Sequence, residues 1–235
     1  MSTTRGLFVT GTDTGVGKTI TSAALLAAMR AAGEPVLAYK PAVTGTEEPP
    51  GAWPPDDQLL ARVSDDDPRA VTSATFGPPL SPHLAARLAG QPLDPAALIA
   101  RARERAATGT LVAEGVGGLL VPLTDSFTIR DLAAALALPV VIVARTALGT
   151  INHTLLTIEA ARHAGLTVAA VVLNQWPADP GVLELSNRET LAALGEVEVA
   201  TLGRVADIDG LAAAGESLPW RRWLAQPTSA AAHIA

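Results

Sequence analysis

The sequence predicts an α/β fold, a three-layer sandwich in which a mostly parallel sheet carries helices on both faces. Short apolar runs of strand length alternate along the chain with longer stretches rich in alanine and leucine, which suit helices. The apolar runs lack the alternating polar residues of a strand with one solvated face. They therefore indicate strands that are buried on both sides.

Apolar runs of strand length cover residues 7–9, 36–39, 111–113, 139–144, 168–173 and 197–202. Stretches of helical length cover residues 18–32, 95–107, 129–136, 151–164 and 181–194. Gly33 and Gly165 stand where two of these helices should end, each shortly before a strand. Strand and helix therefore alternate in the order expected of a parallel sheet.

The domain organisation is predicted to be simple. Residues 1–225 are expected to form one domain, because no linker long enough to separate two domains interrupts the pattern. Residues 41–82 are the least regular region, rich in proline and acidic residues, and long insertions of this kind often carry function. Residues 226–235 are predicted to be a frayed tail.

Composition excludes several classes of function. A net charge of -6 argues against general nucleic-acid binding, which needs a basic face. The chain has no cysteine, which excludes disulfides and thiolate catalysis and suits a reducing compartment. No signal peptide is recognisable, and the longest apolar stretches are too short to span a bilayer. A soluble, cytoplasmic protein is expected, with neither nucleic acid nor membrane as a partner.

The sharpest motif is a glycine-rich loop that joins the first predicted strand to the first predicted helix. It reads Gly11-Thr-Asp-Thr-Gly-Val-Gly17-Lys18-Thr19. Its backbone N–H groups and the helix N-terminus can surround phosphate, which is the arrangement of a P-loop. Five residues instead of four separate Gly11 from Gly17, so the motif is a variant. Lys18 is predicted to hold the β- and γ-phosphates of a nucleotide, and the Thr19 hydroxyl to bind Mg²⁺.

Acidic residues that could complete a magnesium site lie in two places. Glu114 ends the predicted strand 111–113, at the carboxyl edge where open α/β sheets bind ligands. Asp57, in the irregular region, is the second predicted ligand, although its neighbour Asp56 stays an alternative. Together with Thr19 these hard oxygen donors suffice for Mg²⁺, which keeps phosphate and water ligands as well.

Several motifs in order resemble those of the dethiobiotin synthetase family. They are the loop at residues 11–19, Tyr39-Lys-Pro with Thr44-Gly, Ser81-Pro-His, Glu114-Gly-x-Gly-Gly and Gly149-Thr-Ile-Asn-His. The resemblance extends from about residue 6 to about residue 190. It implies a P-loop NTPase-type α/β fold, a homodimer with the substrate site at the interface, and a ligase of biotin biosynthesis. Such an enzyme converts 7,8-diaminopelargonate, CO2 or bicarbonate, and ATP into dethiobiotin, with Mg²⁺ as cofactor.

The resemblance also assigns roles to residues. It makes Lys40 and Lys18 catalytic, since two cations and Mg²⁺ neutralise an anionic carbamate that attacks a triphosphate. It assigns nucleotide binding to Thr12, Asp13, Thr14, Gly15, Val16, Gly17, Lys18, Thr19, Ile20, Glu114, Gly115, Gly117, Gly118 and Asn174. It assigns substrate binding to Thr14, Lys40, Thr44, Leu148, Gly149, Thr150, Ile151 and Asn152. Asn152 also suits an ordinary helix start, and Asn174 an ordinary turn.

Some positions depart from the family pattern. Gly15 stands where many members carry glutamate, and Ser186 or Asn187 stands where some members place a tyrosine near the substrate carboxylate. The preference among ATP, CTP and other triphosphates is therefore left open.

Three other classes of P-loop protein were considered. A partitioning or switch ATPase of the deviant type carries a lysine where this chain has Asp13. A GTPase switch needs an Asn-Lys-x-Asp tetrad, and an amidating relative needs a cysteine nucleophile. The sequence has neither feature. The partitioning ATPase, a binding module instead of a metabolic enzyme, stays the principal alternative.

Overall fold

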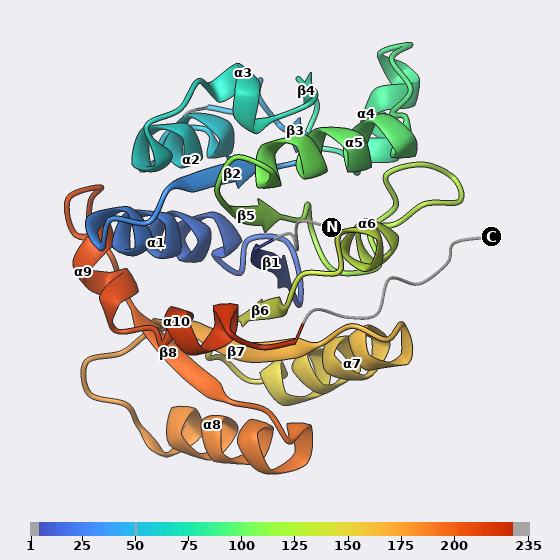
Figure 1. Ribbon diagram of the computed structural model, residues 1–235. Helices are drawn as coiled ribbons and strands as arrows, with labels where there is room; N and C mark the ends of the chain where they lie inside the picture. The colour runs from blue at the N-terminus through green and yellow to red at the C-terminus, as the bar shows by residue number, and fades with distance from the viewer. Residues whose placement is uncertain (1–4, 50, 228–235) are drawn as a thin grey trace.

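A parallel six-stranded sheet forms the centre of the protein (Figure 1), shown in a computed structural model that describes residues 5–49 and 51–227. The strand order is β2-β5-β1-β6-β7-β8. The strands are β1 Gly6–Gly11, β2 Val36–Tyr39, β5 Thr110–Glu114, β6 Val140–Ala144, β7 Val168–Trp176 and β8 Val199–Gly203. Each strand predicted from the sequence is confirmed, with small shifts at the ends.

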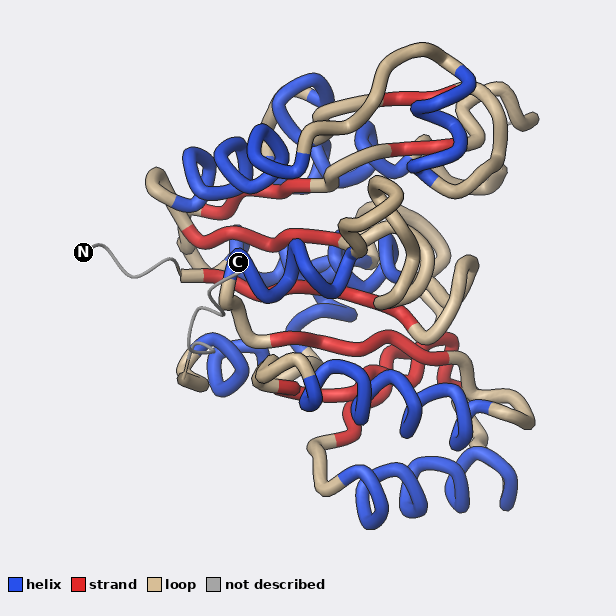
Figure 2. Tube along the Cα trace, turned by 90° about the vertical axis from the view of Figure 1, so that its right-hand side faces the viewer, coloured by secondary structure: helices blue, strands red, loops and turns tan. Residues whose placement is uncertain are grey.

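Helices cover both faces of this sheet, as the two perpendicular views show (Figures 1 and 2). One face carries α1 Lys18–Ala31, α2 Asp56–Ser64, α3 Pro68–Val71, α9 Leu211–Glu216 and α10 Trp220–Leu224. The other carries α5 Pro95–Ala106, α6 Ile129–Leu136, α7 Thr150–His163 and α8 Val182–Gly195. The short helix α4 Pro82–Leu88 lies over a third, small hydrophobic cluster.

Two separate hydrophobic cores follow from the alternation of side chains along each strand. In β1, Leu7 and Val9 pack on the α1 side, whereas Phe8 packs on the α6 side. In β6, Val141 faces the α1 side and Ile142 the opposite side. Successive residues of a strand point to opposite faces, so wholly apolar strands need cover on both. The predicted three-layer α/β sandwich is confirmed.

The predicted irregularity of residues 41–82 is wrong in detail. This region contains a second, two-stranded parallel sheet, β3 Val43–Thr44 and β4 Thr75–Phe76, with α2 and α3 between the strands. Helix α2 starts directly after Pro55 and buries Leu59 and Leu60 against the core beside α1. The surrounding prolines and acidic residues concealed this short helix, because its apolar face spans little more than two turns.

The parallel arrangement gathers chemically important residues at one edge of the sheet. Strand β1 ends at the glycine loop, β2 ends just before Lys40, and β5 ends at Glu114. Asn174 lies near the end of β7, at the same edge. Because the carboxyl ends of parallel strands share one edge, segments far apart in sequence meet there.

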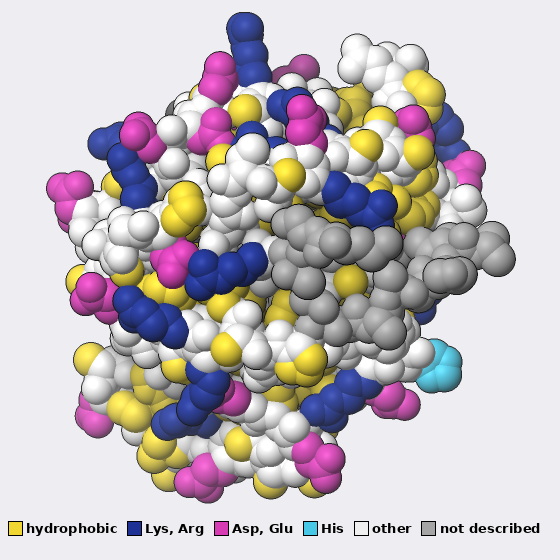
Figure 3. Space-filling model, in the orientation of Figure 1, with side chains coloured by type: hydrophobic (Ala, Val, Ile, Leu, Met, Phe, Trp, Pro, Cys, Tyr) yellow, Lys and Arg dark blue, Asp and Glu magenta, His cyan; other side chains and the backbone are white. Residues whose placement is uncertain are grey.

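The surface shown in Figure 3 intersperses basic and acidic side chains. None of the helices in the described part of the chain combines the length and the apolar character needed to cross a membrane. Of the predicted tail at residues 226–235, residues 228–235 lie outside the described residues.

Candidate active site

The glycine loop turns sharply between β1 and α1. Gly15 and Gly17 have positive φ angles of 74° and 94°, a region that L side chains rarely adopt, and Gly17 is the N-cap of α1. Lys18 folds back over the loop, where its Nζ atom donates to the Asp13 carbonyl at 2.9 Å. Burial lowers the pKa of Lys18 to about 8. This is the geometry of a phosphate cradle with its lysine in place.

Lys40 lies between two carboxylates next to this cradle. Its Nζ atom donates to Glu114 Oε1 and to Asp56 Oδ2, at 2.5 Å in each case. Burial alone would lower the pKa of Lys40, but the two carboxylates outweigh it and raise the pKa above its ordinary value. Burial acts against ionisation of Asp56 too, yet Lys40 holds its pKa below the usual range. The ammonium and the Asp56 carboxylate are therefore both charged at neutral pH.

Glu114 connects this cluster to α1 and leaves one oxygen free. The Thr19 hydroxyl donates to Glu114 Oε1 at 2.8 Å. Glu114 is fully buried, and its Oε2 atom has no hydrogen-bond partner among the described residues. A buried carboxylate oxygen without a partner is costly, so the position calls for a cation or an ordered water.

The side chains around that oxygen fit Mg²⁺. No cluster of three or more His, Cys, Asp or Glu that could bind a metal is found in the described segments. Mg²⁺ does not need one, because it takes one or two carboxylates together with phosphate and water oxygens. Thr19, Asp56 and Glu114 offer such a set.

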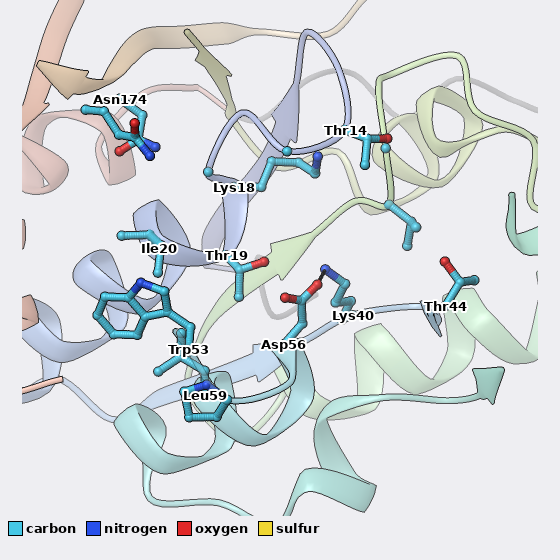
Figure 4. A pocket seen from close by; sticks show the side chains of 16 residues that line it. Thr14, Lys18, Thr19, Ile20, Lys40, Thr44, Trp53, Asp56, Leu59 and Asn174 are labelled. Carbon is cyan, nitrogen blue, oxygen red and sulfur yellow. Dashed lines mark hydrogen bonds and ion pairs between the residues drawn. The ribbon is translucent and has the colours of Figure 1, made fainter. Parts of the chain in front are cut away.

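Asp56, and not Asp57, lies in the cavity (Figure 4). Both residues belong to the first turn of α2. Successive helical residues point about 100° apart, so only one of the pair can face the glycine loop. Of the two candidate ligands that the sequence left open, Asp56 therefore lines the cavity with Thr19, and Asp57 does not.

These residues border one cavity of about 450 Å³. Of the predicted site residues, its lining includes Thr14, Gly15, Gly17, Lys18, Thr19, Ile20, Lys40, Thr44, Gly117 and Asn174. Prediction from sequence missed Trp53, Pro54, Leu59, Val116 and Gln175, which also line it. An aromatic residue in an otherwise proline- and glycine-rich segment was the available signal for Trp53.

Asn174 forms a hydrogen bond to the backbone of the glycine loop. Its Nδ2 atom donates to the Val16 carbonyl at 3.0 Å, and a Cβ atom on Gly17 would lie only 1.8 Å from that nitrogen. Val16 itself is buried. The amide is thus one reason why the loop needs glycine at position 17.

Two glycines after Glu114 have different neighbours, the glycine loop for Gly118 and helix α6 for Gly115. A Cβ atom on Gly118 would lie 3.5 Å from the Gly11 carbonyl, and one on Gly115 would lie 2.7 Å from the Ile129 side chain. Glycine at position 115 therefore lets this segment pass close to α6, whereas the Gly118 distance is an ordinary van der Waals contact.

A second cavity, of about 530 Å³, lies beside the glycine loop. Thr12, Asp13, Thr14 and Gly118 line it together with His153 of α7. Arg145 Nη2 donates to Asp13 Oδ2 at 2.8 Å, which ties the loop before α7 to the glycine loop. The P-loop therefore contributes to both of these cavities.

The predicted substrate residues 148–152 lie at the N-terminus of α7 and do not line the phosphate cavity. Leu148 is 85% exposed, and Gly149 is the N-cap with a φ of 91°. Thr150 is buried and donates to the Arg145 carbonyl at 2.6 Å. Asn187, in α8, donates to the Thr146 carbonyl at 3.0 Å and so holds the same loop.

The fold and this site define a P-loop nucleoside-triphosphate-binding protein. A family model described as AAA domain matches residues 5–214. ATP-dependent dethiobiotin synthetase BioD of Anaeromyxobacter sp. (strain K) is 49% identical over 202 residues, which is 81% of this chain and 89% of the relative. The protein of the same name from Rhodococcus erythropolis is 44% identical over 193 residues, 80% of this chain and 83% of its own. The chain belongs to the dethiobiotin synthetase family.

A solved structure of apo McdA from Cyanthece shares the fold. It aligns with a TM-score of 0.53 over 89% of this chain and 90% of its own. At 12% sequence identity this likeness concerns the fold alone.

Proposed function

We propose that this protein catalyses the ATP- and Mg²⁺-dependent carboxylation and ring closure of 7,8-diaminopelargonate to dethiobiotin, a step of biotin biosynthesis. The observation that carries the proposal is the second lysine at the phosphate cradle. Lys40 and Lys18 line one cavity, and Lys40 donates to Asp56 and to Glu114, which also accepts from Thr19. A nucleotide-binding protein without a second anionic reactant has no evident need for this additional buried cation.

The reaction brings together two anions. One amine of the substrate captures CO2 as a carbamate and releases a proton. A carbamate oxygen then attacks the γ-phosphorus and displaces ADP, which gives a carbamic–phosphoric anhydride. The second amine attacks the carbamoyl carbon, phosphate leaves, and the cyclic urea forms after loss of a proton from that nitrogen.

The protein contributes positioned charge to this sequence. Lys18 binds the β- and γ-phosphates from inside the loop, and Lys40 stands where carbamate and γ-phosphate meet. Because these positive charges are in position before the reaction, they stabilise the negative charge of the transition state without any rearrangement of the protein. Thr14 and Thr44 offer hydroxyl groups on the same cavity wall. Thr19, Asp56 and Glu114 would hold Mg²⁺, which when bound withdraws charge from the phosphate oxygens.

The proposal includes a homodimer that completes the substrate site, with the α7 N-terminus binding the substrate carboxylate. Exposed apolar side chains around the second cavity support it. Leu120 and Leu156 are each 56% exposed, and both line that cavity. Sedimentation of the wild type and of Leu156→Asp tests this part. A dimer that the substitution dissociates is expected, and a wild-type monomer would refute it.

The partitioning ATPase is less well supported. Asp13 occupies the place of its signature lysine, and the Asp13 side chain already accepts hydrogen bonds from the Thr14 N–H and from Arg145. None of the relatives named above carries such a function in its name. A cytoplasmic location belongs to the proposal as well, and the absence of cysteine agrees with it.

One assay separates the two functions. Purified protein is incubated with diamine, bicarbonate, Mg²⁺ and ATP, and dethiobiotin and phosphate are quantified together. Equal amounts of both products are expected. Release of phosphate that does not depend on the diamine, without any cyclic urea, would contradict the ligase and favour the ATPase.

A further inference from the structure

The phosphate cavity has an apolar end that the proposed chemistry does not use. Lys18, Lys40 and Asp56 form its charged part (Figure 4). Away from them, the wall is built by Ile20 and Trp53. Trp53 is the only aromatic residue among the described residues that line this cavity.

The orientation of a bound nucleotide follows from the charged part. The transferred γ-phosphate must reach Lys40, and the preceding phosphates lie in the loop at residues 11–19. The ribose and base therefore extend away from Lys40. Figure 4 shows Ile20 between Asn174 and Trp53 on that side of Lys18 and Thr19.

The position of Trp53 is well defined by its neighbours. Trp53 is partly buried and packs against the core cluster that contains α1 and α2. Leu59 lies on the same side (Figure 4), and both Leu59 and Pro54 line the cavity. The indole is therefore held at the cavity wall and retains an accessible surface there.

We propose that Trp53 is a nucleotide-binding residue whose indole packs against the base or ribose of the triphosphate. This inference rests on the proposed nucleotide site, and it assigns the apolar wall of that site to the base or ribose. Every nucleobase has a π face, so packing on an indole tolerates any base, whereas hydrogen bonds to base edges discriminate between bases. Trp53 thus supplies affinity that is shared by ATP and CTP, and any preference between them must come from polar neighbours such as Asn174 and Gln175.

Equilibrium binding with Trp53→Ala and Trp53→Phe tests this assignment. The probes are a non-hydrolysable ATP analogue, the corresponding CTP analogue and inorganic triphosphate, which lacks base and ribose. Trp53→Ala is expected to weaken both nucleotide analogues about tenfold and to leave inorganic triphosphate unchanged. Trp53→Phe, which keeps an aromatic face, is expected to retain most of the affinity.

Trp176→Phe is the matched control, since Trp176 packs against the core on the opposite face of the sheet. Nucleotide should quench indole fluorescence in this control but not in Trp53→Phe. Unchanged nucleotide affinity in Trp53→Ala would overturn the assignment. So would an equal loss for inorganic triphosphate, which would indicate a structural effect. Because only binding is measured, failure of the proposed ligase reaction would be a separate result.

Discussion

The Nζ atom of Lys40 lies 2.5 Å from Oε1 of Glu114, in a place where both side chains are excluded from solvent. Removing the lysine therefore has two consequences. Lys40→Ala is expected to lower dethiobiotin formation by roughly 10²–10³-fold, because the charge that joins carbamate and γ-phosphate is lost. Nucleotide affinity should stay near the wild-type value. Product formation and equilibrium nucleotide binding, measured on the same preparation, check this prediction.

The stability effect of Lys40→Ala needs its own control. The substitution leaves the buried Glu114 carboxylate without its cationic partner. This lowers the free energy of unfolding by about 3–5 kcal/mol. The double variant Lys40→Met with Glu114→Gln removes both charges and should recover much of this stability, but no activity. Lys18→Ala, in contrast, should weaken nucleotide binding as well as turnover. A fully active Lys40→Ala would remove Lys40 from the mechanism.

The neighbouring aspartates of α2 provide a matched pair for the metal site. Asp56→Asn is expected to raise the Mg²⁺ concentration for half-maximal activity about tenfold or more, because a hard anionic oxygen is lost from the cavity. Asp57→Asn changes charge equally, one residue away, and should leave the Mg²⁺ dependence unchanged. Titration of activity with Mg²⁺ at saturating ATP distinguishes the two. Equal shifts in both variants would indicate a general electrostatic effect instead of a ligand.

The strands and the phosphate loop could be predicted from sequence because each rests on a local pattern. Wholly apolar runs identified the sheet, and the glycine spacing before Lys18 identified the cradle. The role of Trp53 could not be predicted, because it depends on how α2 and its preceding loop pack beside α1. The choice between Asp56 and Asp57 depends on the rotation of α2 about its axis, which two adjacent identical residues do not reveal.

Gly17 and Gly15 form a second matched pair, in the loop itself. Both have positive φ, so an alanine costs about 1–2 kcal/mol of backbone strain at either position. At Gly17 the new Cβ would also lie 1.8 Å from Asn174 Nδ2, whereas nothing lies within 4 Å at Gly15. Gly17→Ala must therefore displace Asn174 from its hydrogen bond to Val16.

Thermal unfolding and nucleotide binding measure the difference. Gly15→Ala is expected to lower the Tm by about 2–4 °C per kcal/mol of strain. Gly17→Ala should lower it further and should weaken nucleotide binding about tenfold. If the two variants have the same Tm and the same nucleotide affinity, the contact between residue 17 and Asn174 contributes to neither.

Lys18 gives nucleotide binding a pH dependence of defined sign. Its pKa in the protein without nucleotide is about 8, lowered by burial. Bound phosphate favours the charged ammonium and raises that pKa, so affinity is complete below pH 8 and falls as the pH rises above it. Above pH 8, nucleotide binding must therefore be accompanied by uptake of one proton. The affinity for a non-hydrolysable analogue should fall about tenfold from pH 7 to pH 9.

Calorimetry at each pH measures this affinity. Divalent cations are left out so that hydrolysis of the metal ion does not affect the result. Lys18→Ala should bind weakly at both pH values without the slope, and the same slope in that variant would assign the titration to another group.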